Sequence, residues 1–479
     1  MASIPMPHDP FLSWFGIDHG VIRRVLTVLG ARGADHGELY FQHDRSSHIA
    51  MRDGIVGEAY TSIDQGVGMR VVVGDQVGYA YTEDLTEAAM LGAARTAAAI
   101  AAGNDAVVPP VDVTTAELGD RYRIDLPWAD IGVQARLDLV QKAEALTKAK
   151  NPAIKKVRVS LSDSEQRILI ATLEGHIVVD ERPMSRLWVN TTATRDGETQ
   201  SNGSNLAGRH GMDWYTDERL DTVATEAVDR TMILFDAVRP KAGEWPVVLA
   251  AGASGILLHE AIGHGMEADF NRKGESIYSE MLGRSVAPEF VTVVDDGTQE
   301  GERGALNVDD EGTPAGKTLL VENGVLRSYL HDRISAKHYG IAATGSGRRE
   351  SFRHTPMPRM RSTYMESGPH DPDEIIKSVD YGIVAETFTN GQVQIGAGDF
   401  TFYIKNGWLI EGGRKTAPIK DINIIGNGPE ALKAVTMVGN DSKLDSGGWT
   451  CGKNGQGVPV SQGMPTVLVS KLNVGGSDA

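Results

Sequence analysis

The sequence predicts an α+β protein: an N-terminal α+β region with antiparallel sheets and helices, followed by a β-rich C-terminal domain that carries the helix of a candidate metal site. Three observations support this fold class. Before residue 240, segments that alternate between apolar and polar residues end at turn-forming pairs such as Asp-Gly. Segments with helical periodicity flank these strands. From Pro246 onwards, glycine becomes frequent and long helical segments become scarce.

The chain has 479 residues, which is enough for two or three domains. The first predicted unit covers residues 1–112. We expect a helix at 16–37, strands across 38–63 with an Asp-Gly turn, a hairpin at 66–82 that turns at Gly74-Asp75, and an alanine-rich helix at 87–103. The stretch "VVPPVDV" at 107–113 marks the end of this unit.

The second predicted unit covers residues 113–240. A helix is expected at 130–150 and another at 215–238. Between them, strands across 154–202 form an antiparallel meander whose turns fall at Asp-Ser, Glu-Gly and Asp-Gly pairs. The segment 239–246 reads as a linker to the third unit.

The third predicted unit covers residues 241–479. A strand, "WPVVLA", precedes the glycine-rich "AGASG". Two segments, "LLVENGVLRSYL" and "FYIKNGWLIEGG", are predicted hairpins because each has Asn-Gly between β-forming residues. Further strands are expected at 291–294, 391–395 and 465–471.

Composition restricts the partners and the location. The formal net charge is −17, which opposes non-specific adhesion to nucleic acid or to an anionic membrane. No basic start followed by an apolar run indicates a signal peptide, and the alanine-rich helix is too interrupted to span a membrane. The single cysteine, Cys451, allows no intrachain disulfide, which fits a reducing compartment. We therefore predict a cytoplasmic protein.

The segment "GILLHEAIGHGMEADF", 255–270, contains two histidines five residues apart. In a regular α-helix each residue turns by about 100°, so a five-residue spacing leaves His259 and His264 roughly 140° apart. Gly263 and Gly265 flank the second histidine, and glycine tolerates a π-type turn or a bend that would bring the two rings together. Glu260 follows His259 directly, where H-E-x-x-H enzymes have their general base.

A catalytic zinc site usually has three protein ligands, so two histidines leave one ligand to be found. Candidates are acidic residues, other histidines, or Cys451 in the glycine-rich "LDSGGWTCGKNGQGVP". Two alternatives stay open from the residues alone. Cys451 can be a small buried residue of the core, and the histidine pair can arise by chance.

The segment "RRESFRHTPMPRMR", 348–361, is a basic island with five arginines and one acid. Arg348, Arg349 and Arg353 are candidates for gripping a substrate carboxylate or carbonyl. The alternative is an ion-paired structural loop. His354 is a candidate donor to a tetrahedral intermediate. Glu267 is a candidate partner for the second nitrogen of a metal-bound histidine, with a solvated helix charge as its alternative.

The chain resembles the TldD/TldE (PmbA) family of metallopeptidases, and within it the TldD type of subunit that holds the metal. The resemblance rests on "HEAIGHGMEADFNRKG", "DEGTPAG", "GSGRRESFRHTPMPRM" and "MVGNDSKLDSGGWTCGKNGQGVPV". It implies a zinc site with His259, His264 and Cys451 as ligands and Glu260 as the catalytic base. It also implies peptides or unfolded protein segments as substrates, including modified peptide precursors and antitoxins. The partner it implies is a TldE/PmbA-like subunit in a heterodimer, or a second copy in a homodimer.

Two other functions stay open. The chain can be a non-catalytic, zinc-stabilised subunit that binds peptides or acts like a chaperone. It can also be a hydrolase of a non-peptide amide, which would share the same site. Iron or cobalt fits the same ligand types as zinc.

Overall fold

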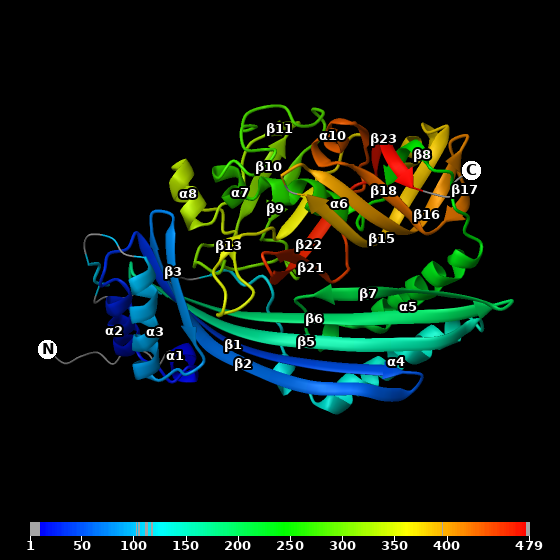
Figure 1. Ribbon diagram of the computed structural model, residues 1–479. Coiled ribbons are helices and arrows are strands. Elements are labelled where there is room, and N and C mark those ends of the chain that lie inside the picture. The colour runs from blue at the N-terminus through cyan, green and yellow to red at the C-terminus, as the bar shows by residue number, and fades with distance from the viewer. Residues whose placement is uncertain are drawn as a thin grey trace.

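The computed structural model describes residues 10–101, 103, 106–110, 114–115, 118–394 and 396–475. Its N-terminal half is built around one sheet of very long strands, with the order β3-β2-β1-β5-β6 and with β4 and β7 both paired to β6 (Figure 1). The strands are β1 His36–Arg52, β2 Ile55–Val73, β3 Gln76–Thr82, β4 Thr114–Thr115, β5 Ile154–Thr172, β6 His176–Arg195 and β7 Glu198–Gly208.

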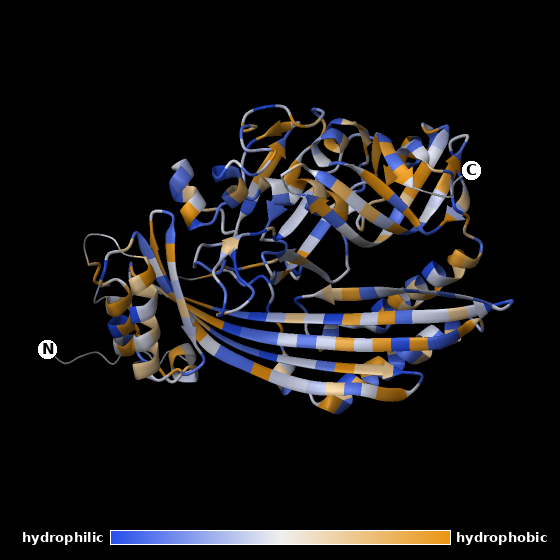
Figure 2. Ribbon diagram, viewed as in Figure 1, coloured by the Kyte–Doolittle hydropathy of each residue, from blue (hydrophilic) through white to orange (hydrophobic). Residues whose placement is uncertain are grey.

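Alternation along these strands divides the sheet into two faces, and Figure 2 shows the alternating bands. On β1 and β5 the buried apolar residues with odd numbers face the helices. Helices α1 Pro10–Trp14, α2 His19–Leu29 and α3 Glu87–Ile100 lie at one end of the strands, and α4 Val133–Lys150 and α5 Asp217–Met232 lie at the other. Even-numbered residues such as Tyr40 and Ile170 pack instead against Val308 and Phe352 of the C-terminal half.

The C-terminal half contains two larger sheets. One has the order β11-β10-β9-β14-β22-β20, with β21 paired to β22. The other runs β15-β8-β23-β18-β16-β17, with β19 paired to β23, and an additional β15–β16 pairing closes five of its strands into a ring. The strands are β8 Gly243–Leu249, β9 Val293–Asp296, β10 Lys317–Glu322, β11 Val325–Leu326, β12 Gly347–Arg348, β13 Met357–Pro358, β14 Ser362–Met365, β15 Tyr381–Gln394, β16 Asp399–Glu411, β17 Arg414–Ile419, β18 Ile422–Asn427, β19 Val435–Val438, β20 Lys443–Leu444, β21 Trp449–Lys453, β22 Gln456–Met464 and β23 Val467–Gly475.

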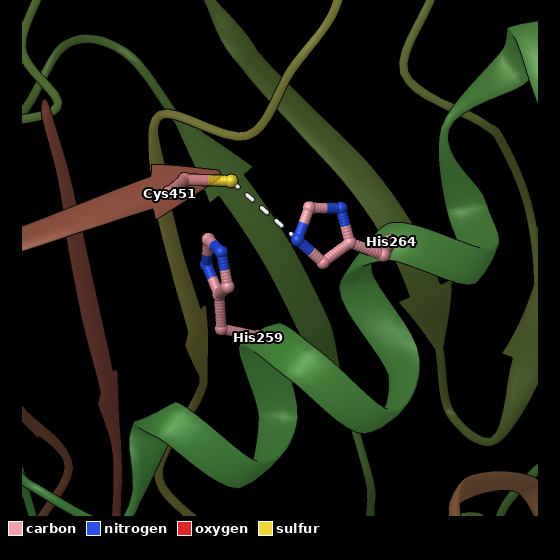
Figure 3. A group of neighbouring side chains, drawn as sticks. All are labelled: His259, His264 and Cys451. Carbon is pink, nitrogen blue, oxygen red and sulfur yellow. Dashed lines mark hydrogen bonds between the residues drawn. The ribbon is translucent and has the colours of Figure 1, made fainter. Parts of the chain in front are cut away.

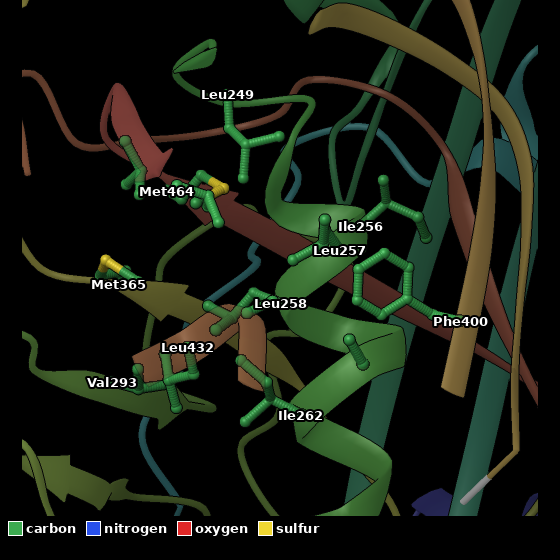
Figure 4. Packing of buried hydrophobic residues seen from close by; sticks show 14 of the residues in the cluster. Leu249, Ile256, Leu257, Leu258, Ile262, Val293, Met365, Phe400, Leu432 and Met464 are labelled. Carbon is green, nitrogen blue, oxygen red and sulfur yellow. The ribbon is translucent and has the colours of Figure 1, made fainter. Parts of the chain in front are cut away.

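The helix that carries the histidines lies between these two sheets. It begins with α6 Gly255–Leu258, whose leucines and Ile262 pack among side chains of both sheets (Figure 4). Burying this apolar surface fixes the helix in place, because close-packed neighbours leave it no alternative position. The remaining helices are short: α7 Ala268–Arg272, α8 Arg333–Tyr339, α9 Pro372–Lys377 and α10 Gly428–Lys433.

The α+β prediction is confirmed, and several predicted elements differ in extent. The helix expected at 16–37 ends at Leu29, since Gly33 has a φ of +84° and β1 already begins at His36. The Asp53-Gly54, Gly74-Asp75 and Asp196-Gly197 turns are present. The Asp-Ser pair does not turn, because Asp163 lies inside β5 and forms a buried ion pair with Arg136 (2.8 Å).

The two predicted Asn-Gly hairpins have different outcomes. Asn323-Gly324 forms the turn between β10 and β11, with φ values of 48° and 77°. The second prediction is wrong: β16 runs straight through Asn406, and the chain turns at Gly412-Gly413. Asn406 is buried, and its amide bonds Asn202, Thr387 and the carbonyl of Arg230. These long-range bonds hold the asparagine in an extended strand.

The long sheet joins strands from both of the first two predicted units, since β1 pairs with β5 along its length. The boundary predicted at residue 112, and Ile395 at the end of one predicted strand, lie outside the described residues. Among the residues described, no helix is both long and apolar enough to span a membrane.

Candidate metal centre

The backbone between the two histidines forms a π-helical turn, His259–Gly263, inserted after α6. The N–H of His264 donates to the carbonyl of His259, five residues earlier. A turn of this width brings residues five apart onto one side of the helix. The two rings therefore face each other, with centroids 5.1 Å apart.

Cys451 on β21 completes the cluster. One ligand atom from each of His259, His264 and Cys451 can be chosen so that all lie within 4.8 Å of one another. Cys451 Sγ lies 3.5 Å from His264 Nε2, and Figure 3 shows the thiol and both rings pointing toward one another from the helix and the strand. Zinc binds nitrogen at about 2.0–2.1 Å and thiolate sulfur at about 2.3 Å, so the ligand atoms around one ion lie roughly 3–4 Å apart. The spacing of the three residues fits such an ion.

The electrostatic interactions of the cluster favour negative charge on Cys451. Burial disfavours the thiolate, but the nearby His259 and His264 outweigh burial and hold the pKa of Cys451 well below its usual range. Burial likewise opposes the charge on His264, while Glu267 and Cys451 raise the pKa of its imidazole well above the ordinary value. A cation between these atoms would stabilise the thiolate in place of the proton. His259 Nδ1 is buried and has no hydrogen-bond partner among the described residues.

Glu267 orients His264. Its Oε2 lies 3.0 Å from His264 Nδ1, which leaves Nε2 directed at the thiol. The carboxylate is fully buried and also pairs with Lys453 Nζ at 3.0 Å. Burial works to raise the pKa of Glu267, but Lys453 and His264 lower it to about 2. The carboxylate is therefore ionised at neutral pH and accepts the Nδ1 hydrogen, as the partners of metal-bound histidines commonly do.

Glu260 lies at the edge of the cluster. Its Oε2 is 3.9 Å from His264 Nε2, the nitrogen that also faces Cys451. The Glu260 side chain is 21% exposed, whereas the side chain of His264 is 4% exposed. Solvent can therefore reach the carboxylate.

The two glycines act differently from the sequence-based expectation. Gly263 has φ −59° and ψ −47°, an ordinary helical conformation, and Gly265 also has no positive φ. What they provide is space. A Cβ on Gly263 would lie 2.1 Å from Met360 Sδ, and one on Gly265 would lie 2.8 Å from Tyr278. The helix needs glycine there so that it can approach its neighbours closely.

The arginine segment is mostly bound to the protein itself. Arg348 donates to the carbonyls of Met360 (2.6 Å) and Pro459 (2.7 Å). Arg349 is buried and pairs with Glu38. Arg353 forms ion pairs with Asp64 and Glu83, and His354 Nδ1 lies 3.0 Å from Ser351 Oγ. None of these four residues belongs to the His259, His264 and Cys451 cluster in the described part of the chain.

Two neighbours of the cluster are absent from the sequence-based candidates. Lys453 pairs with both Glu267 and Asp269. It is two residues beyond Cys451 on the same strand. Residues two apart on a strand point to the same face, and this rule places Lys453 beside Cys451 from the sequence alone. Arg359 donates to the carbonyl of Cys451 at 2.5 Å. No local pattern distinguishes Arg359 from the other arginines of its segment.

Comparison with protein-family models identifies the class of protein to which this chain belongs. Residues 37–101 match PmbA/TldA metallopeptidase domain 1, residues 126–235 match the central domain, and residues 242–476 match the C-terminal domain. All three models describe metallopeptidases. The class is therefore metallopeptidase.

Curated relatives are similar over nearly the whole chain. A protein named metalloprotease TldD homolog from Haemophilus influenzae is 37% identical over 462 residues, 95% of each chain. A metalloprotease from Methanothermobacter thermautotrophicus is 31% identical and covers 96% of this chain and 100% of its own. The chain belongs to the PmbA/TldD family of metallopeptidases.

Two further relatives bear on the metal and the fold. A zinc metalloprotease TldD homolog from Saccharolobus solfataricus is 36% identical over 238 residues, 50% of this chain and 53% of its own. The crystal structure of TldE from Thermococcus kodakarensis superposes with a TM-score of 0.75 and 17% identity, covering 95% of this chain and 99% of that one. At that identity the likeness concerns the fold alone.

Proposed function

We propose that this chain is a zinc-dependent peptidase that hydrolyses peptides or unfolded protein segments, such as modified peptide precursors or antitoxins. The observation that carries the proposal is the convergence of two imidazoles and a thiol, from segments 187 residues apart, beside a partly exposed glutamate. Three protein ligands with room for a fourth group are typical of catalytic zinc.

Two of the three proposed ligands are supported by neighbouring side chains. His264 is oriented by Glu267. The nearby histidines lower the pKa of the Cys451 thiol, and Arg359 donates to the backbone carbonyl of Cys451. Histidine and thiolate donors favour zinc among common divalent ions. When bound, zinc supplies a Lewis acid that polarises the scissile carbonyl and promotes ionisation of water.

Glu260 acts as the general base in this proposal. Its carboxylate accepts a proton from the attacking water molecule and then donates that proton to the leaving amine. The support is its position at the open edge of the cluster, 3.9 Å from His264 Nε2. Replacing a general base typically lowers the rate by about 10²–10⁴-fold.

We also propose a partner. The likeness of the fold to a TldE structure is compatible with a heterodimer with a TldE/PmbA-like subunit, and a homodimer is the alternative. Mass measurement of the purified chain, alone and mixed with such a relative, distinguishes the two.

The substitution Glu260→Gln tests the proposed peptidase activity. We expect this variant to retain one zinc ion per chain and to lose cleavage of a mixed-peptide pool, measured by metal analysis and mass spectrometry. Glu280→Gln, at an exposed glutamate of the same domain, is the matched control and should cleave as the wild type does. Full cleavage by Glu260→Gln would reject Glu260 as the base. A wild-type protein that binds zinc, unfolds without it and cleaves nothing would favour a zinc-stabilised binding subunit.

A further inference from the structure

A cavity of about 230 Å³ lies between the long sheet and the β21–β22 hairpin. Tyr40, Ser164 and Gln166 line it from the sheet, and Thr450 and Pro459 line it from the hairpin. Thr450 is the residue before Cys451, so the cavity adjoins the strand that carries the candidate ligand. The rest of its surface is dominated by arginines: Arg182, Arg209, Arg303, Arg348 and Arg349.

Positive charge exceeds negative charge in this lining. Among the described residues, only two of the five arginines form ion pairs: Arg182 with Asp180 and Asp310, and Arg349 with Glu38. The cavity lining contains two carboxylates, Asp310 and Glu350. Glu350 is exposed, and it accepts a hydrogen bond from the N–H of Gly457 at 2.6 Å.

The other three guanidinium groups contact backbone carbonyls. Arg209 donates to Pro183 (3.3 Å), Arg303 to Trp449 (3.2 Å), and Arg348 to Met360 and Pro459. These three arginines are only 4%, 7% and 3% exposed, respectively.

Burying three arginines that have no carboxylate partner is costly in free energy, and the Tyr122 ring, 4.8 Å from Cζ of Arg209, offsets only part of that cost. Burial, reinforced by Arg186 and Arg209, lowers the pKa of Arg303 to about 10. Burial also lowers the pKa of Arg348 to about 9, although Asp310 partly offsets it. A carboxylate in the cavity would offset this cost, because charge-assisted bonds from guanidinium to carboxylate are among the strongest hydrogen bonds in proteins.

Unused hydrogen-bond donors point to the same conclusion. Arg209 Nε, and Arg349 Nε and Nη1, are buried and have no hydrogen-bond partner among the described residues. Both arginines line the cavity. A carboxylate offers two oxygens that accept several such donors at once.

We propose that this cavity binds a carboxylate of the peptide substrate and gives the enzyme a preference for peptides that carry one. This inference rests on the proposed peptidase function. Arg209, Arg303 and Arg348 supply the charge, and the cavity admits either an acidic side chain or a free C-terminus. Arg209 and Arg303 are distant from Arg348 in the sequence, and only the fold brings the three together.

The test compares four matched fluorogenic peptides, with Asp or Asn at one position and with a free or amidated C-terminus. The wild type is expected to show a kcat/KM at least about tenfold higher for the peptides with the recognised carboxylate. Arg303→Met should abolish that preference while still cleaving the uncharged peptide, and Arg303→Lys should restore part of it. The Asp/Asn pair and the acid/amide pair reveal which carboxylate is bound. Arg327→Met, at a half-exposed arginine paired with Glu322, is the control.

Binding of the same labelled peptides to Glu260→Gln, followed by fluorescence anisotropy, separates this inference from the peptidase proposal. Carboxylate-dependent binding that is lost in Arg303→Met supports the cavity even if no peptide is cleaved. Cleavage or binding that is equal for charged and uncharged peptides overturns it, as does an equal loss for all four peptides in a folded Arg303→Met protein. Thermal unfolding checks the fold, and Arg209→Met provides a second, independent variant.

Discussion

Replacing Glu267 by glutamine removes the buried negative charge that lies between His264 and Lys453. The change keeps the size of the side chain and replaces one carboxylate oxygen, a hydrogen-bond acceptor, by an amide NH₂ group. If Glu267 orients a metal-bound histidine, zinc affinity should fall about 10- to 100-fold, the usual effect of losing such a partner. The prediction therefore tests the role of the histidine and of its support together.

The effect on stability follows from the same contacts. The pKa of Glu267 is lowered from 4.5 to about 2, by Lys453 and His264 acting against burial, and a tenfold change in acidity equals about 1.4 kcal/mol. The ionised carboxylate is therefore worth roughly 3 kcal/mol at pH 7. A lowered carboxyl pKa stabilises the fold above pH 4.5, and this stability is lost as the pH falls through 2. Removing one partner of a buried pair costs a similar amount, about 3–5 kcal/mol.

The assays measure the two effects separately. Competition with a chromogenic chelator gives the zinc affinity, and thermal unfolding of the metal-free protein gives the stability. The double variant Glu267→Gln/Lys453→Met removes both charges of this pair but also takes the partner of Asp269 away, so it should recover only part of the stability and keep the weak zinc binding. Glu275→Gln, at an exposed position on the same segment, is the control. Zinc affinity equal to that of the wild type in Glu267→Gln would refute the reasoning.

Two further predictions concern stability. Gly263→Ala should lower the free energy of unfolding by about 1–3 kcal/mol, because the new methyl group overlaps Met360 Sδ. Adding Met360→Ala to the same chain should relieve the clash. A Gly263→Ala protein as stable as the wild type would reject the steric explanation. Burial and the neighbouring Glu311 raise the pKa of Asp309 to about 7 and that of Asp332 to about 6. The folded protein then holds protons that the unfolded chain releases, so this contribution to stability is full below about pH 4 and is lost as the pH rises through 6 and 7. Urea unfolding between pH 5 and 8 should show the decline, and Asp309→Asn should flatten it; an unchanged slope would contradict the assignment.

Much of the backbone was predictable because it depends on neighbouring residues. The turn at Asp53-Gly54 and the turn at Asn323-Gly324 need a left-handed conformation that these residue pairs adopt readily. The five-residue spacing of the histidines required a departure from α-helical geometry, and a π-helical turn is present. The same local rule failed at Asn406, where long-range hydrogen bonds hold the residue in a strand.

The sequence by itself determined the α+β class, the long alternating strands and the presence of glycines beside the second histidine of the candidate metal motif. These properties follow from periodicity and local backbone preference, which act over a few residues. Only the tertiary structure brought Cys451 within 3.5 Å of His264, and only it showed that Gly263 is required for space beside Met360. It also gathered Arg209, Arg303 and Arg348 around one cavity. Such convergence depends on packing between segments far apart in the chain, and no local pattern in the sequence encodes it.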